Sequence, residues 1–142
     1  MMEVIDAENM ILGRLATRVA KELILGKKIV IVNAEKSVVT GKKDVIFPRY
    51  KEKFDRGNRY KGPFFPKEPH MIVKRTIRGM LPFQRPKGKN AFKNLIVHIG
   101  VPDEFKDKQL KRIEKASIEK SNSTRFVFVE DISKFLGWKP KI

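Results

Sequence analysis

The sequence predicts an α/β fold with a parallel β-sheet, and two observations carry this prediction. Residues 2–7 and 29–34 are both suited to strands, and residues 12–24 between them place apolar side chains at helical spacing. The second strand segment is β-branched almost throughout, which is typical of a strand buried on both faces of a parallel sheet. Strand, helix and strand within this short stretch form one βαβ unit, whose crossover is expected to be right-handed.

The helix of this unit has clear boundaries in the sequence. Asn9 is suited to cap its N-terminus, and Gly26 is suited to the left-handed conformation that often ends a helix. One helical face is apolar and should pack on the sheet; it consists of Leu12, Leu15, Ala16, Val19, Leu23 and Ile24.

The middle of the chain predicts two helices separated by a long loop. Apolar residues in 43–55 indicate a helix that is interrupted or begins near Pro48, with Phe47 and Phe54 as local core. Residues 55–69 carry two Gly and three Pro without a hydrophobic period, which indicates an extended loop. A basic loop of this length is usually functional.

A second helix should begin at His70 and end near Gly79 or Met80, because Pro82 disfavours helical geometry before it. The expected buried stripe consists of Val73, Ile77, Met80 and Leu81. The cations Lys74, Arg75 and Arg78 lie on a face about 120° away from this stripe.

The C-terminal part predicts two more strands. A second basic loop covers residues 85–89, and the apolar run 95–100 indicates the third strand. Residues 103–120 are highly charged and predict a loop and a weak, solvated helix. Residues 126–129 indicate the fourth strand, after which Asp131 is expected to cap a short final helix through Leu136.

Positive charge is concentrated in one part of the 142 residues. Residues 42–93 contain sixteen Lys or Arg and four Asp or Glu, so this stretch carries +12 of the total net charge of +16. A field this strong and local attracts a polyanion, because each neutralised phosphate releases condensed counterions. The length is that of a single domain, 1–142, and a nucleic acid is the expected partner.

Several classes of enzyme are excluded by what the sequence lacks. It has no cysteine, so disulfides, thiolate nucleophiles and cysteine-ligated metals are excluded. Thr40-Gly41-Lys42-Lys43 resembles a phosphate loop superficially but has Lys36 where Gly is needed and Lys43 where Ser or Thr is needed. The first βα turn has only Gly13, so a dinucleotide site is not supported. A small nucleotide-dependent α/β enzyme remains the alternative from a different class, and no cofactor or small-molecule substrate is expected.

The two histidines and one acidic group have structural interpretations that compete with functional ones. His98 alternates with apolar residues in a strand, which favours a structural role. His70 follows Pro69 at a helix start, where a cap and an RNA contact are both compatible with the sequence. Asp103, Glu104 and Asp107 could be a metal site, but acids in the first turn of a helix also stabilise its dipole.

Basic and aromatic residues alternate in the middle of the chain, which favours RNA. Arginine binds phosphates or base edges, and exposed aromatic rings stack on unpaired bases. Tyr60, Phe64 and Phe65 lie among Gly and Pro and are candidates for docking. No helix-turn-helix, zinc finger or heptad pattern of a DNA-binding protein is present. The candidate RNA contacts outside the second helix are Arg49, Lys53, Arg56, Arg59, Tyr60, Lys61, Arg85, Lys87 and Lys89.

The N-terminus and the hydropathy pattern predict a soluble, cytoplasmic protein. Residues 1–6 are acidic and do not form a basic region before an apolar core, so they do not resemble a secretory signal. Apolar runs are far shorter than the ~20 residues that span a bilayer, so no membrane partner is expected.

Four segments, in order, resemble the large-subunit ribosomal protein L13 (uL13) family over roughly residues 2–102. The most specific is Arg78-Gly79-Met80-Leu81-Pro82 after a basic helix. Gly100-Val101-Pro102 stands where bacterial members tend to carry a His-Pro-His tail, so the sequence is most similar to the archaeal and eukaryotic branch, and its shortness favours archaeal members. The other three segments are Ile5-Asp6-Ala7, Leu12-Gly13-Arg14-Leu15-Ala16, and Val32-Asn33-Ala34-Glu35 with Thr40-Gly41-Lys42-Lys43.

This resemblance implies a three-layer α/β/α fold with a mostly parallel four-stranded sheet and long basic loops. It implies contact with large-subunit rRNA and neighbouring ribosomal proteins, and a role in early subunit assembly. Residues 42–93 would be a basic RNA-binding insertion and 103–142 a divergent C-terminal part. Matching positions imply rRNA contacts at Lys42, Lys43, Lys74, Arg75 and Arg78. An RNA-binding translational regulator acting off the ribosome remains compatible with the same basic surface.

Overall fold

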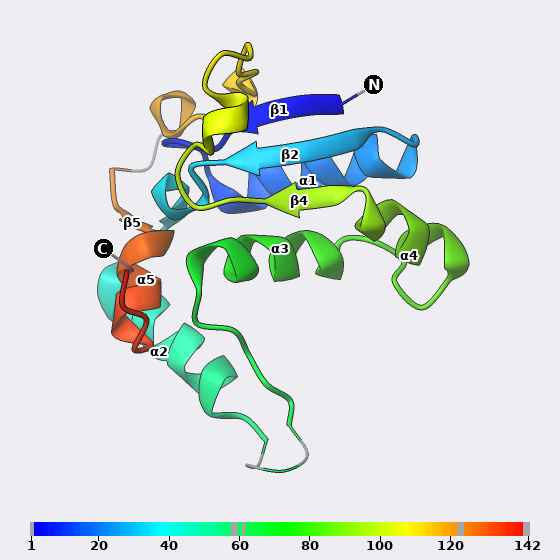
Figure 1. The fold of residues 1–142 in the computed structure, drawn as a ribbon. Helices are drawn as coiled ribbons and strands as arrows, with labels where there is room; N and C mark the ends of the chain where they lie inside the picture. Colours follow the sequence, from blue (N-terminus) through cyan, green and yellow to red (C-terminus); the bar gives the residue numbers. More distant parts are fainter. Residues whose placement is uncertain (1, 58–59, 61, 122–123, 141–142) are drawn as a thin grey trace.

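The computed structural model describes residues 2–57, 60, 62–121 and 124–140, and a parallel three-stranded sheet lies at its centre. The sheet has the order β1-β2-β4, with Val4 opposite Val30 and Ile31 opposite Val97. Helix α1 connects β1 to β2 and lies behind β2 in Figure 1. The predicted βαβ unit is therefore confirmed. The bounds are β1 Met2–Asp6, α1 Leu12–Ile24, β2 Lys28–Val32 and β4 Leu95–Val97.

The C-terminal end of α1 is as predicted, whereas its N-terminal end is not. Gly26 adopts the left-handed conformation, with φ +94°. Its N–H donates a hydrogen bond to the backbone carbonyl of Leu23 at 3.0 Å, and the N–H of Lys27 donates to the backbone carbonyl of Glu22 at 3.3 Å. This pair of bonds satisfies the last carbonyls of the helix. The prediction that Asn9 caps α1 is wrong: Ile11 precedes the helix, and Asn9 adopts φ 59° in a turn.

One face of the sheet packs on α1 and on α3, Pro69–Gly79. Because side chains alternate along each strand, Ile5, Ile31 and Val97 all point to this side and share a core with both helices. Helix α3 lies alongside β4 in Figure 1. Its Ile77 is fully buried, so this helix is anchored by its apolar side.

The opposite face of the sheet is covered by irregular structure. Val4, Val30 and Val32 pack with Phe105, and Val101 and Leu110 complete this smaller cluster. The three-layer α/β/α arrangement is therefore not confirmed, and the weak α-helix predicted within 103–120 is wrong. Apolar side chains are too sparse there to form a helical face, and the chain instead forms three 3₁₀ turns: Asp103–Phe105, Glu114–Ala116 and Ile118–Lys120.

The predicted fourth strand forms, but it belongs to a different sheet. Strand β5, Phe126–Phe128, pairs antiparallel with β3, Val38–Thr40, so that Val127 lies opposite Val39. The expected four-stranded sheet is therefore wrong. After β5 the chain enters α5, Val129–Phe135, whose N-cap is Phe128 and not Asp131 as predicted.

Helix α2, Lys43–Asp55, runs through Pro48 without a break. Proline has no backbone N–H, so one helical hydrogen bond is lost. This loss is tolerated here because Pro48 lies on the exposed side of a peripheral helix. Phe47 packs on Phe135 with ring centroids 4.6 Å apart, as expected for local core. Phe54 is 36% exposed, so its assignment to the core is wrong. Figure 1 shows α2 and the extended segment formed by residues 62–68 projecting away from the sheet.

The second basic loop predicted at residues 85–89 is instead the start of a helix, α4, Pro86–Lys93. Pro86 occupies the first helical turn, where its missing N–H costs nothing. Gly88 lies directly against the backbone of Pro82 and Phe83, where a Cβ atom would collide. A glycine that suggested a loop is therefore required for close packing.

Two Gly→Ala substitutions are expected to have opposite effects on stability. Gly88→Ala should lower the free energy of unfolding by about 1–3 kcal/mol, because the added Cβ meets backbone that cannot rotate away. Gly13→Ala in α1 should raise it by about 0.5–1 kcal/mol, since nothing lies within 4 Å of the added atom and Ala favours helix. Urea unfolding of both variants checks this, and equal effects would contradict the close approach at Gly88.

Candidate nucleic-acid interface

The basic residues of α3 lie on the side of the helix away from its buried residues. Ile72, Val73 and Ile77 have no exposed surface, and they fix the rotation of the helix about its axis. Lys74 and Arg75 are half-buried and Arg78 is exposed on the other side. Met80, expected in the buried stripe, is 42% exposed, because the helix ends one residue earlier.

Each of these three cations lies over an aromatic ring. Lys74 Nζ is 5.1 Å from the ring centre of Phe92 and Arg78 Cζ is 4.1 Å from that of Phe83. Arg75 Cζ lies 5.5 Å from the ring centre of Phe65. In the described part of the chain no carboxylate forms an ion pair with any of the three. The rings hold the cations in place without neutralising them, so their charge is available to a phosphate.

The basic face of α3 borders two neighbouring clefts that have Arg75 and Gly79 in common. Arg75, Arg78 and Arg85 line a cleft of about 650 Å³ formed by the turn after α3. Arg75 also lines a second cleft of about 360 Å³ with Lys53 and Arg56 at the end of α2. Residues from α2, α3 and the start of α4 therefore meet around Arg75. Lys87 and Lys89 are exposed on α4 beyond Arg85.

The remaining candidates on α2 and in the loop after it are less closely grouped. Arg49 is exposed, Lys53 Nζ lies 5.1 Å from the ring centre of Tyr50, and Arg56 is paired with Glu52 at 3.1 Å. Tyr60 is 85% exposed. Arg59 and Lys61 lie outside the residues that the structure describes.

Lys42 and Lys43 lie at the opposite end of α2, about 20 Å along its axis from Arg56. They line a cleft of about 450 Å³ together with Arg125, whose carbonyl accepts a hydrogen bond from Gly41 N–H at 3.0 Å. Arg125 is a candidate that sequence reasoning missed. It joins this group only because β3 and β5 pair antiparallel, and the sequence did not reveal that pairing.

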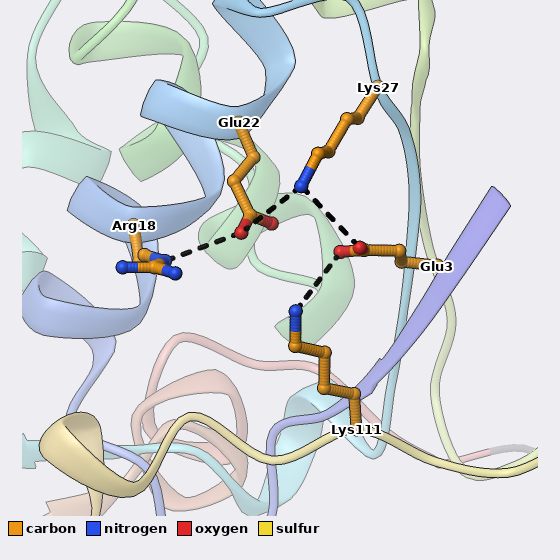
Figure 2. A network of polar contacts seen from close by, with 5 residues as sticks. All are labelled: Glu3, Arg18, Glu22, Lys27 and Lys111. Atoms are coloured by element: carbon orange, nitrogen blue, oxygen red, sulfur yellow. Dashed lines mark hydrogen bonds and ion pairs between the residues drawn. The ribbon is translucent and has the colours of Figure 1, made fainter. Parts of the chain in front are cut away.

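Three cations near β1 and α1 are paired with carboxylates instead, as Figure 2 shows. The side chain of Glu22 is only 7% exposed. Its Oε1 forms ion pairs with Arg18 Nε at 3.3 Å and with Lys27 Nζ at 3.8 Å. Glu3 lies 3.6 Å from both Lys27 and Lys111. This network ties β1, α1 and the segment around Lys111 together. Its three cations differ in this respect from Lys74, Arg75 and Arg78, which pair with no carboxylate among the described residues.

The network is expected to make stability sensitive to acid. Burial opposes ionisation of Glu3, but Lys111 and Lys27 together outweigh it and hold the pKa of this carboxyl below its usual 4.5. A lowered pKa in the folded state stabilises the protein above about pH 4.5, and this stabilisation is lost as the pH falls through the folded-state value. The free energy of unfolding of the wild type should therefore fall more steeply below pH 4.5 than that of the Glu3→Gln variant. Parallel curves of this free energy against pH would contradict the stabilising role of ionised Glu3.

The two histidines and the acidic group do not form a metal site. Burial lowers the pKa of His70, and its buried Nδ1 has no hydrogen-bond partner among the residues that the structure describes. His98 lies 5.8 Å from the ring of Phe105, and Asp103 pairs with Lys106 at 2.7 Å. Across residues 2–57, 60, 62–121 and 124–140, no group of three or more His, Asp or Glu could hold a metal ion. None of the helices described is long and apolar enough to cross a membrane.

Comparison with known proteins identifies the family. Residues 1–104 match the family model described as Ribosomal protein L13. The chain is 48% identical over 137 residues to "Large ribosomal subunit protein uL13" of Archaeoglobus fulgidus, covering 96% of this chain and 88% of the relative. It is also 48% identical over 142 residues to the protein of that name from Methanocaldococcus jannaschii, covering 97% and 99%. The chain belongs to the ribosomal protein L13 family, a family of ribosomal proteins and not of enzymes.

Proposed function

We propose that this protein is a structural constituent of the large ribosomal subunit in the cytoplasm, where it binds rRNA and supports early subunit assembly. The observation that carries the proposal is the unpaired basic face of α3, formed by Lys74, Arg75 and Arg78, in a chain of this family. Phosphates of structured RNA match this face, because the three cations are fixed by rings and remain at least partly accessible to solvent.

The rest of the candidate surface extends this contact in two directions. Arg85 continues it toward α4, on which Lys87 and Lys89 are exposed, and Lys53 and Arg56 continue it toward the end of α2. Lys42, Lys43 and Arg125 form a second basic group at the other end of α2, about 20 Å along the helix axis from Arg56. Two separated groups can engage phosphates of different rRNA segments, which is how a small protein would stabilise rRNA early in assembly. Neighbouring ribosomal proteins are further partners.

A translational regulator acting off the ribosome would use the same basic surface. Sucrose-gradient sedimentation of cell extract separates the two functions. Co-sedimentation with the large subunit through a high-salt wash supports the ribosomal role. A pool bound to mRNA and absent from washed subunits would contradict it.

A further inference from the structure

An apolar pocket opens beside the basic face of α3. It has a volume of about 320 Å³, its walls include Phe64, Met71, Phe83 and Phe92, and Lys74 and Arg78 stand at its rim. Phe64 is 68% exposed and Met71 is 40% exposed. Phe64 and Met71 are therefore open to solvent within the most basic part of the protein, whereas Phe83 and Phe92 are half-buried.

The inner wall of this pocket is already ordered. The rings of Phe83 and Phe92 meet edge to face, with centroids 5.5 Å apart and planes at 82°. Arg78 covers Phe83 at 4.1 Å and Lys74 covers Phe92 at 5.1 Å. The flat guanidinium of Arg78 is itself a surface on which a base can stack. The volume is at the lower end of the range for small-molecule sites, so it suits a single flat group.

The occupant must combine a flat, largely apolar group with negative charge beside it. We propose that the pocket accepts one unpaired nucleobase of the rRNA, with its flanking phosphates on Lys74 and Arg78. A paired base cannot enter, because its faces are covered by its neighbours in the helix. This inference rests on the proposed function and adds to it the recognition of a single-stranded nucleotide.

The surroundings of the pocket favour a polynucleotide over an acidic peptide. Arg78 also lines the adjoining cleft together with Arg75 and Arg85. Further cations therefore lie next to the pocket along the surface. A nucleic-acid strand carries a phosphate at every nucleotide and matches such a succession of cations. A peptide would need acidic side chains spaced around a single apolar one.

Ultraviolet cross-linking of the full chain to a large-subunit rRNA transcript, followed by mass spectrometry, tests the proposal. Nucleotide adducts are expected on Phe64, Met71, Phe83 or Phe92. Adducts confined to other residues would overturn the pocket while leaving rRNA binding intact. Cross-links from these four residues to a neighbouring protein in intact subunits, without a nucleotide adduct, would assign the pocket to a peptide and overturn the proposal. Absence of any rRNA binding by the wild type would remove the proposed function itself.

A pair of variants adds a quantitative test. Phe64→Ala should weaken binding to the same transcript about 5-fold to 150-fold, as expected for the loss of one base–aromatic stack. The salt dependence of binding should not change, because the phosphate contacts remain. Leu25→Ala removes a side chain that is 70% exposed at the end of α1 and should bind as the wild type does. Phe64→Ala binding with wild-type affinity, while its circular dichroism shows a folded protein, would overturn the proposal.

Discussion

Replacing Lys74, Arg75 and Arg78 together by Gln is expected to abolish incorporation into the large subunit while the protein still folds. Gln keeps part of each aliphatic stem over its ring, but the three unpaired charges are lost. The sequence alone predicts almost no stability cost for these positions. The three ring contacts raise the expected stability cost to about 1.5–3 kcal/mol, at about 0.5–1 kcal/mol for each cation–π pair.

The matched control carries the same change of charge on other elements. Lys21, Lys28 and Lys36 are exposed, and none forms an ion pair among the described residues. Their replacement by Gln should leave incorporation close to normal. Quantifying each variant in purified subunits, beside thermal melts, checks the prediction. Equal loss of incorporation in both triple variants would show that total charge matters and the position of α3 does not.

Ile77→Ala is expected to act in the opposite way, on stability and not on binding. Ile77 has no exposed surface and lies in the main core with α1 and β4. Its truncation should lower the free energy of unfolding by about 2–5 kcal/mol, through lost burial and the cavity that remains. Below its melting temperature the variant should bind rRNA as the wild type does, because the cations are on the other side of α3.

Met80→Ala provides the comparison for Ile77, since it truncates a similar apolar side chain at the end of the same helix. Met80 is 42% exposed, so the cost should be below about 1 kcal/mol. Denaturant unfolding and rRNA binding, measured on both variants, decide the matter. Loss of binding by folded Ile77→Ala would mean that this side of α3 contributes to the contact.

The elements predicted well are those whose hydrophobic pattern extends over many residues. Ile29 to Val32 are all buried, as an uninterrupted β-branched run in a parallel sheet requires, and α1 follows its 3.6-residue period. The errors concern short elements, although the short strand β4 is predicted correctly. Strand β3 has only three residues, too few for a period, and β5 was assigned to the wrong sheet because its partner was unknown. The sequence does not predict α4, because Pro86 and Gly88 are residue types that are typical of loops.

The candidate surface could be predicted in composition but not in arrangement. The spacing of Lys74, Arg75 and Arg78 places them on one helical face, and the structure has them there. Their ring partners Phe65, Phe83 and Phe92 come from segments before and after α3, and no local pattern links them. Phe64 and Phe65 were predicted together as docking residues, yet Phe65 packs on Tyr50 at 6.0 Å and only Phe64 is largely exposed.

The salt dependence of rRNA binding tests most directly whether the unpaired cations carry the contact. For ~6–10 phosphate contacts, the affinity of the wild type should fall by roughly 10³–10⁵ between ~50 and ~200 mM salt. The slope of log K against log salt should be smaller by about 2–3 for the α3 triple-Gln variant, and unchanged for the Lys21, Lys28 and Lys36 variant. An affinity of the wild type that does not change with salt, or equal slopes for all three proteins, would contradict the account.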